Sequence, residues 1–329
     1  MSRLRQGFGT QGLLASWLAS PPPDAAIEIA ADRVAAAALS TRGSGLVVNG
    51  HGVETLAAGV ITPSLTGANV HDRPAVAAAL TRVLERLGSR VRRVALVIPD
   101  TAVKVSLLRF DKVPPRRDDL DQLVRWQLRK AAPFPVDEAS VTYTPGVELD
   151  GGGREFVVEM ARREVIREYE AVCEDANVYA GLVDTSTLAL LGLFAGDTAP
   201  PGDWLLVHVR PDYTAIAIAR REHLIFYRSR PEDEGSDLED LVHQTAMYYQ
   251  DRLAGKGFAR VMLAGSGGII GALEVAQRSL EERLGVVVTP VDPTRTAALT
   301  DRIGTAPDLM NMLAPLVGIL RRTHGEVRA

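Results

Sequence analysis

The feature that most constrains this fold is an order of strands and helices that occurs twice along the chain. In the second half, three predicted strands are followed by alternating helices and strands. The first half begins with the same order, but a segment whose strands and helices do not follow this order interrupts it. The predicted strands are 26–30, 34–39, 46–48, 54–60, 93–99, 179–184, 204–209, 214–219, 224–227, 260–264 and 286–291, and the predicted helices are 75–87, 185–194, 236–253, 269–284 and 309–320. A shared order without shared residues indicates an internal structural duplication.

Two α/β halves that face each other across a cleft have the architecture of actin-like ATPases. We therefore predict an α/β actin-like ATPase fold of two duplicated halves, with an α+β subdomain inserted in the first half. The predicted parts are an N-terminal extension at 1–24, a first half at 25–99 plus 178–198, an inserted subdomain at 100–177, and a second half at 203–329.

The predicted extension carries Arg3 and Arg5 ahead of a short apolar stretch that contains Trp17. Two interpretations stay open at this point. The segment is either a frayed terminus or a basic, Trp-bearing segment that rests on a membrane surface.

Composition excludes several classes of function. The chain has 37 Lys and Arg against 41 Asp and Glu, a net charge of −4, whereas domains that bind nucleic acid usually carry a basic excess. No apolar run reaches the length of about 18 residues that a transmembrane helix needs. The single cysteine, Cys173, lies on the apolar stripe of a predicted helix at 163–176, so we expect a buried thiol.

A nucleotide site in this fold needs a Gly- or Ser-rich hairpin turn in each half, whose backbone N–H groups point at phosphate oxygens. The first turn, residues 27–34, contains neither residue type, and Glu28 stands where an Asp would help to hold Mg²⁺. Asp32 would place a negative charge beside the phosphates. Arg33 could contact a phosphate, but the sequence favours an exposed turn charge.

The second turn is no better suited to phosphate. Pro211 removes a backbone donor, and His208 stands where the second Asp is expected. A third turn with Gly265, Gly267 and Gly268 follows a strand, where the backbone can approach an adenosine. We therefore expect no catalytic residue, no metal ligand, no cofactor and no enzymatic activity, with binding of ATP and Mg²⁺ as the alternative.

Four segments carry a resemblance to a known family: residues 97–103, 123–138, 161–166 and 182–186. The most specific piece is Pro133-Phe134-Pro135 followed by Asp137-Glu138, an apolar tripeptide that closes an amphipathic helix and an acidic pair before a strand. Together these segments resemble the PilM family of type IV pilus assembly proteins. That family is actin-like, is similar to the cell-division protein FtsA, and has relatives in type II secretion systems.

The resemblance implies a cytoplasmic scaffold at the inner face of the cytoplasmic membrane, with mainly indirect membrane contact. It implies a partner, the cytoplasmic tail of a PilN-like single-span protein, besides other pilus platform proteins. It is compatible with a homo-oligomer. Since the family's binding groove involves the inserted subdomain, partner contacts are expected at Phe110, Leu123, Trp126, Pro133, Phe134 and Pro135.

The chain departs from this family at the first hairpin turn. Members that bind ATP have an Ile-Asp-Ile-Gly-Ser-Ser-Ser-Val-Lys-like turn, and its polar and glycine positions are replaced here by Glu28, Ala30, Ala31, Asp32, Arg33 and Ala35. The sequence thus predicts a docking protein with a degenerate phosphate site. The alternative is a nucleotide-dependent switch of the same machinery. A sugar or acid kinase of this fold would need a catalytic carboxylate and intact phosphate turns, and neither is evident.

Overall fold

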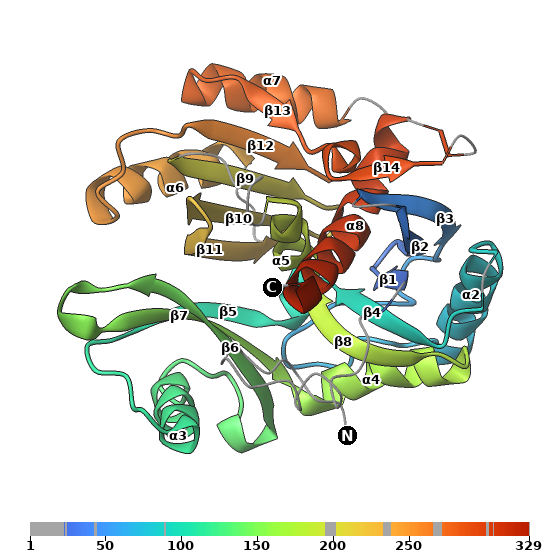
Figure 1. The fold of residues 1–329 in the computed structure, drawn as a ribbon, viewed down its shortest axis with the longest axis horizontal. Helices are drawn as coiled ribbons and strands as arrows, with labels where there is room; N and C mark the ends of the chain where they lie inside the picture. The colour runs from blue at the N-terminus through green and yellow to red at the C-terminus, as the bar shows by residue number, and fades with distance from the viewer. Residues whose placement is uncertain are drawn as a thin grey trace.

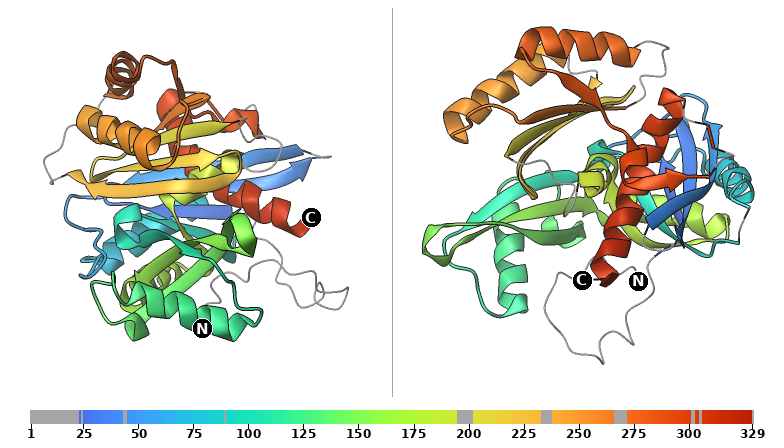
Figure 2. Two further views of the ribbon diagram at one scale, coloured as in Figure 1. Left: turned by 90° about the vertical axis from the view of Figure 1, so that its left-hand side faces the viewer. Right: turned by 45° about the horizontal axis from the view of Figure 1, so that its top comes forward.

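The computed structural model describes residues 23, 25–42, 45–88, 90–194, 202–232, 238–265, 272–300, 303–304 and 306–328. Three sheets and their helices form two similar halves and an inserted subdomain (Figures 1 and 2). The extension predicted over residues 1–24 lies almost wholly outside the described residues, as do Gly267 and Gly268. In the part of the chain that is described, no helix is long and apolar enough to cross a membrane.

The first half is built on a six-stranded sheet with the order β14-β3-β2-β1-β4-β8. Its strands are β1 (Ala25–Ile29), β2 (Arg33–Arg42), β3 (Gly45–Thr55), β4 (Arg93–Ile98), β8 (Tyr179–Thr185) and β14 (Ala297–Leu299). The helices that cover it are α2 (Arg73–Glu85), α4 (Arg163–Asp175), α5 (Ser186–Leu191) and α8 (Pro307–Arg328). Ile27 of β1 packs in the core with α2 and α4, and Ala26 in the core with α5 and α8. Successive side chains of an extended strand point to opposite faces, so this central strand is buried throughout and apolar except at Glu28.

The second half repeats this topology. Its strands are β9 (Asp203–Val209), β10 (Tyr213–Arg220), β11 (His223–Pro231), β12 (Arg260–Ala264) and β13 (Val288–Pro290), with the helices α6 (Leu238–Arg252) and α7 (Ala272–Leu284). The order β11-β10-β9-β12-β13 matches the order β3-β2-β1-β4-β8 of the first half strand for strand. The duplication predicted from element order is therefore present in the sheet topology.

The inserted subdomain is a three-stranded antiparallel sheet with the order β5-β7-β6, at the lower left of Figure 1. Its elements are β5 (Lys104–Phe110), α3 (Arg117–Leu128), β6 (Ala139–Glu148) and β7 (Arg154–Arg162). α3 covers one face of this sheet, where Val124 and Leu128 pack with Phe110 and Phe156.

Helix α4 corrects the predicted end of the insertion. The sequence places residues 163–177 in the inserted subdomain, but Val165, Tyr169 and Cys173 pack in the core of the first half, with α2. The insertion thus ends with β7, at Arg162. The apolar stripe of α4 covers the first-half sheet, while α3 already covers the inserted one. Cys173 is fully buried, as predicted.

The predicted second half, residues 203–329, is also too long. β14 pairs in parallel with β3 at the edge of the first-half sheet. α8 packs against α5 and against β1 and β2 of the first half. A strand of three residues gives no readable period, so the return of the chain to the first half leaves no pattern in the sequence.

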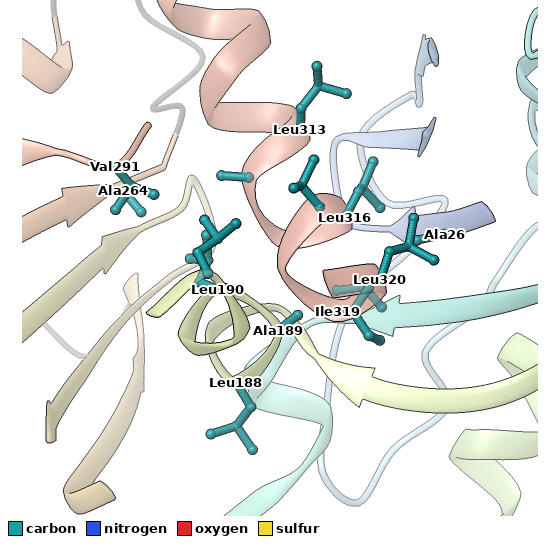
Figure 3. Packing of buried hydrophobic residues seen from close by; sticks show 14 of the residues in the cluster. Ala26, Leu188, Ala189, Leu190, Ala264, Val291, Leu313, Leu316, Ile319 and Leu320 are labelled. Atoms are coloured by element: carbon teal, nitrogen blue, oxygen red, sulfur yellow. The ribbon is translucent and has the colours of Figure 1, made fainter. Parts of the chain in front are cut away.

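α8 and α5 form an apolar cluster that both halves share, which we call the joint (Figure 3). Ala26 reaches it from the first-half sheet, and Ala264 and Val291 reach it from the second half. A Cβ atom on Gly318 would overlap the carbonyl oxygen of Ala189, so the two helix backbones are in direct contact. Burial of this much apolar surface holds the halves together without any directional contact. The labelled side chains of the two helices are Leu188, Ala189, Leu190, Leu313, Leu316, Ile319 and Leu320.

Candidate functional site

Two hairpin turns, one from each half, lie at the cleft between the halves. The β1–β2 turn is closed by a hydrogen bond from the Ala30 N–H to the Arg33 carbonyl, at 2.9 Å. The β9–β10 turn is closed by the same bond from the Arg210 N–H to the Tyr213 carbonyl, at 2.8 Å. The duplication therefore gives two turns of one backbone geometry and different side chains.

Charged side chains of these turns meet in a buried group. Arg33 Nη2 donates to Glu28 Oε2 at 3.2 Å, and Arg33 Nη1 donates to Asp32 Oδ2 at 3.1 Å. Arg210 comes from the other half, and its Nη2 donates to Asp32 Oδ1 at 3.3 Å. Arg210 Nη1 also lies 3.9 Å from Glu28 Oε2. Glu28, Arg33 and Arg210 are each at most 5% exposed.

A second set of contacts crosses the cleft beside the first. Asp100, which follows β4 and is fully buried, accepts hydrogen bonds from the backbone N–H of Thr187 and from the hydroxyl of Tyr227 on β11. Thr187 Oγ1 lies 2.8 Å from Nδ1 of His208 on β9. We call this whole group the cleft cluster: Glu28, Asp32, Arg33, Asp100, Thr187, His208, Arg210 and Tyr227.

Burial and opposite charges set the protonation of the cleft cluster. Burial would lower the pKa of Arg210, but the carboxylates of Glu28 and Asp32 hold it above its ordinary value. Burial raises the pKa of Asp32, and Arg210 opposes that rise. Burial lowers the pKa of His208, so its imidazole is neutral at pH 7. Arg210 and Asp32 thus form a charged pair across the cleft, whereas the neutral His208 contributes only its polarity.

Asp212, in the β9–β10 turn, is a carboxylate in an unfavourable environment. Burial raises its pKa to about 6, although Arg210 acts in the opposite direction. Within the described residues its Oδ2 atom is buried and has no hydrogen-bond partner. A carboxylate in such a position costs free energy in its ionised form.

Several charges at the cleft are unfavourable for the phosphates of a nucleoside triphosphate. Glu28 and Asp32 already accept from Arg33 and Arg210, and two further carboxylates, Asp100 and Asp212, would repel phosphate. Gly265 has φ of 123°, and a Cβ there would overlap the carbonyl of Val209, so packing against β9 explains this glycine.

The structure bears on two sequence interpretations of the turns. Arg33 is not an exposed turn charge, because Glu28 binds it inside the cleft. The error arose because Arg210, which shares its acceptors, comes from the other half of the duplication. His208 is a buried structural residue, as the sequence favoured.

A groove lies between the inserted sheet and the two halves. β6 alternates: Val141 and Tyr143 pack toward α3, whereas Thr142 and Thr144 line cavities on the other face. The larger cavity is about 320 Å³ and has walls from the inserted sheet, the first half and the second half. We call this the insertion groove, and its main lining residues are Ile98, Thr142, Thr144, Val157, Glu159, Val183, Leu188 and Leu224.

The residues predicted to contact a partner lie on the α3 side of the inserted sheet. Phe110 and Phe134 pack in the core beneath α3, and Phe110 is only 8% exposed. Trp126 is 53% exposed, and the Lys130 ammonium lies 4.6 Å from its ring centroid. None of the six predicted residues lines the cavities of the insertion groove.

The sequence contained a signal for the groove that the prediction missed. Ser140, Thr142 and Thr144 alternate with apolar residues along β6. Such alternation is typical of a strand with one core face and one polar face. The most specific piece of the family resemblance, residues 133–138, follows α3, so the predicted contacts lie on the helix side of the sheet.

Two halves of one topology, paired hairpin turns at the cleft and a subdomain inserted before α4 define a protein of the actin-like ATPase fold. A family model described as type IV pilus assembly protein PilM matches residues 26–232. The chain belongs to this family, which assembles type IV pili.

The chain is also similar to several solved structures. A PilM–PilN type IV pilus biogenesis complex matches with a TM-score of 0.77 and 17% identity, over 93% of this chain and 98% of that one. The protein EutJ from Carboxydothermus hydrogenoformans matches with a TM-score of 0.49, 10% identity, and coverage of 92% and 90%. An actin-like ATPase-fold protein of unknown function from Bacteroides thetaiotaomicron matches with a TM-score of 0.47 and 12% identity, over 88% of this chain and 96% of that one. No curated protein sequence matches the chain.

Proposed function

We propose that this protein is a docking component of a type IV pilus assembly platform at the inner face of the cytoplasmic membrane. It binds the cytoplasmic tail of a PilN-like membrane protein in the insertion groove. The observation that carries the proposal is the likeness to a PilM–PilN complex over 93% of the chain, inserted subdomain included.

The groove has the chemistry that an extended peptide needs. Its larger cavity, about 320 Å³, can take an apolar side chain between Leu188 and Leu224. Thr142 and Thr144 offer hydroxyl groups along one wall. β6 is also an edge strand of its sheet, so a tail can add to it by backbone hydrogen bonds.

The cleft cluster supports docking that does not require nucleotide, because its carboxylates are already bound to arginines of the chain itself. Calorimetry with a synthetic peptide of the partner's cytoplasmic tail tests both statements. We expect binding without nucleotide, and the same affinity after ATP and Mg²⁺ are added. Binding that appears only with ATP would establish the nucleotide-dependent switch instead.

Two variants locate the binding surface. Thr144→Arg fills the larger cavity of the insertion groove and is expected to weaken binding at least about tenfold, the loss of one well-placed contact. Trp126→Ala, on the exposed side of α3, leaves the affinity unchanged. The opposite result would move the site to the residues that the sequence predicted. No binding by the unaltered protein in either condition would reject the proposal.

A further inference from the structure

Three separate contacts of the cleft cluster join a residue of one half to a residue of the other. Arg210 binds Asp32, Tyr227 binds Asp100, and His208 meets Thr187. We propose that these contacts form an ionic latch, in which the chain's own guanidinium groups hold the cleft closed where this fold otherwise receives a nucleotide and a metal ion.

The two arginines of the latch are balanced by two carboxylates without any added ion. Glu28 and Asp32 supply two negative charges, and Arg33 and Arg210 supply two positive charges. A buried carboxylate needs a paired cation. Since Arg210 belongs to the second half, opening the cleft would take one of the two cations away from Glu28 and Asp32.

The latch acts by fixing the geometry of the two halves more than by adding to the free energy of unfolding. Buried ion pairs often contribute little net stability compared with apolar packing, but they fix one geometry. The joint already holds the halves together through apolar burial. The latch therefore selects the angle between the halves, and the angle no longer depends on a ligand.

Arg220 and Asp203 provide a matched comparison. Arg220 Nη2 lies 2.8 Å from Asp203 Oδ2, so the pair has good geometry, but both residues belong to the second half. Loss of this pair removes an arginine–carboxylate interaction without removing any contact across the cleft.

Distance measurements between spin labels across the cleft test the latch. Ala78→Cys on α2 and Gln244→Cys on α6 place labels at exposed positions of opposite halves. Cys173 does not compete for the label, because it is fully buried and burial raises its pKa to about 12. We expect one narrow distance distribution in the parent protein, unchanged by ATP and Mg²⁺.

Arg210→Met in this labelled background is expected to broaden the distribution and add longer distances, whereas Arg220→Met leaves it narrow. If Arg210→Met does not fold, Asp32→Asn carries the test, because it removes the negative charge that Arg210 and Arg33 share and keeps the side-chain shape. A distribution that stays narrow in the folded Arg210 or Asp32 variant overturns the latch. So does a parent protein whose distances shorten with ATP. Binding of the partner peptide is measured separately, so either result leaves the docking proposal to its own test.

Discussion

The two halves of this protein meet in two regions, and the two regions use opposite chemistry. The joint is made of aliphatic side chains from α5 and α8, with Gly318 lying directly against the Ala189 carbonyl. The cleft cluster is made of charged pairs and hydrogen bonds with defined directions. Apolar packing resists separation in many orientations, whereas paired charges are satisfied in one. The comparison indicates that the joint keeps the halves together and the cleft cluster sets their angle.

The largest effect is expected at the cleft. Arg210→Met leaves the buried Glu28 and the partly exposed Asp32 with one cation between them, and loss of one partner of a buried pair typically costs about 3–5 kcal/mol. Urea denaturation measures the change. The control is Arg220→Met, at a pair whose arginine is 45% exposed, where about 0–1 kcal/mol is expected. Equal losses in the two variants would remove the distinction between a bridging pair and an ordinary one.

The next effect tests the joint. Gly318→Ala places a methyl group against the Ala189 carbonyl and is expected to cost about 1–3 kcal/mol, although alanine is the better helix former by about 1 kcal/mol. Thermal and urea unfolding report the loss. Gly304→Ala is the control, because a Cβ atom at that exposed position meets nothing within 4 Å. A stable Gly318→Ala protein would mean that the joint tolerates displacement and does not fix the helix spacing.

A smaller effect of opposite sign is expected at Asp212. Its folded pKa of about 6 lies above the ordinary 3.8, so the native state binds its proton more tightly than the unfolded chain does. The penalty is absent below about pH 4 and fully present above pH 6. Asp212→Asn should therefore stabilise the protein by about 1–3 kcal/mol at pH 8, the upper figure corresponding to the full rise in pKa from 3.8 to about 6, and by almost nothing at pH 4.

Denaturant curves at the two pH values check the Asp212 prediction. Asp251→Asn, at an exposed acid on α6, serves as the control and should behave alike at both. A gain at pH 4 as large as the gain at pH 8 would show that the carboxylate charge is not the cause.

The smallest effect is expected outside both regions. Trp126→Ala on α3 removes an exposed ring and its contact with Lys130, and surface changes of this kind usually stay within about 0.5 kcal/mol. Urea denaturation of this variant sets the background against which the cleft and joint variants are judged. A loss above 1 kcal/mol would mean that the inserted subdomain depends on α3 more than its exposure indicates.

The element order was readable from the sequence because long periodic segments determine it. The strand at 93–99 and the helix at 75–87 appear as β4 and α2 with small shifts at their ends. α4 was assigned to the wrong part because chain continuity with β7 says nothing about which sheet its apolar stripe will cover. The strand predicted at 46–48 lies inside β3, which continues through Gly50 and Gly52 packed against α2, whereas the strand predicted at 54–60 was wrong beyond Thr55, where β3 ends.

The candidate sites were less accessible to sequence reasoning. The loss of phosphate-binding residues in both turns was visible, but the pairing of Arg210 with Asp32 joins the two halves and has no local signal. The same holds for Tyr227 and Asp100. The insertion groove had a local signal in the alternation of β6, yet its other wall comes from α5 and β11, which only the folded chain brings there.

The return of β14 and α8 to the first half has a consequence for biosynthesis. A ribosome releases residues 25–194 long before residues 297–328, yet the inner face of the first-half sheet needs α8 to cover Ala26 and its neighbours. While the second half is being translated, that apolar face lacks the part of its cover that α8 provides. The nascent first half should therefore attract chaperones, and its final consolidation should wait for translation of the closing helix.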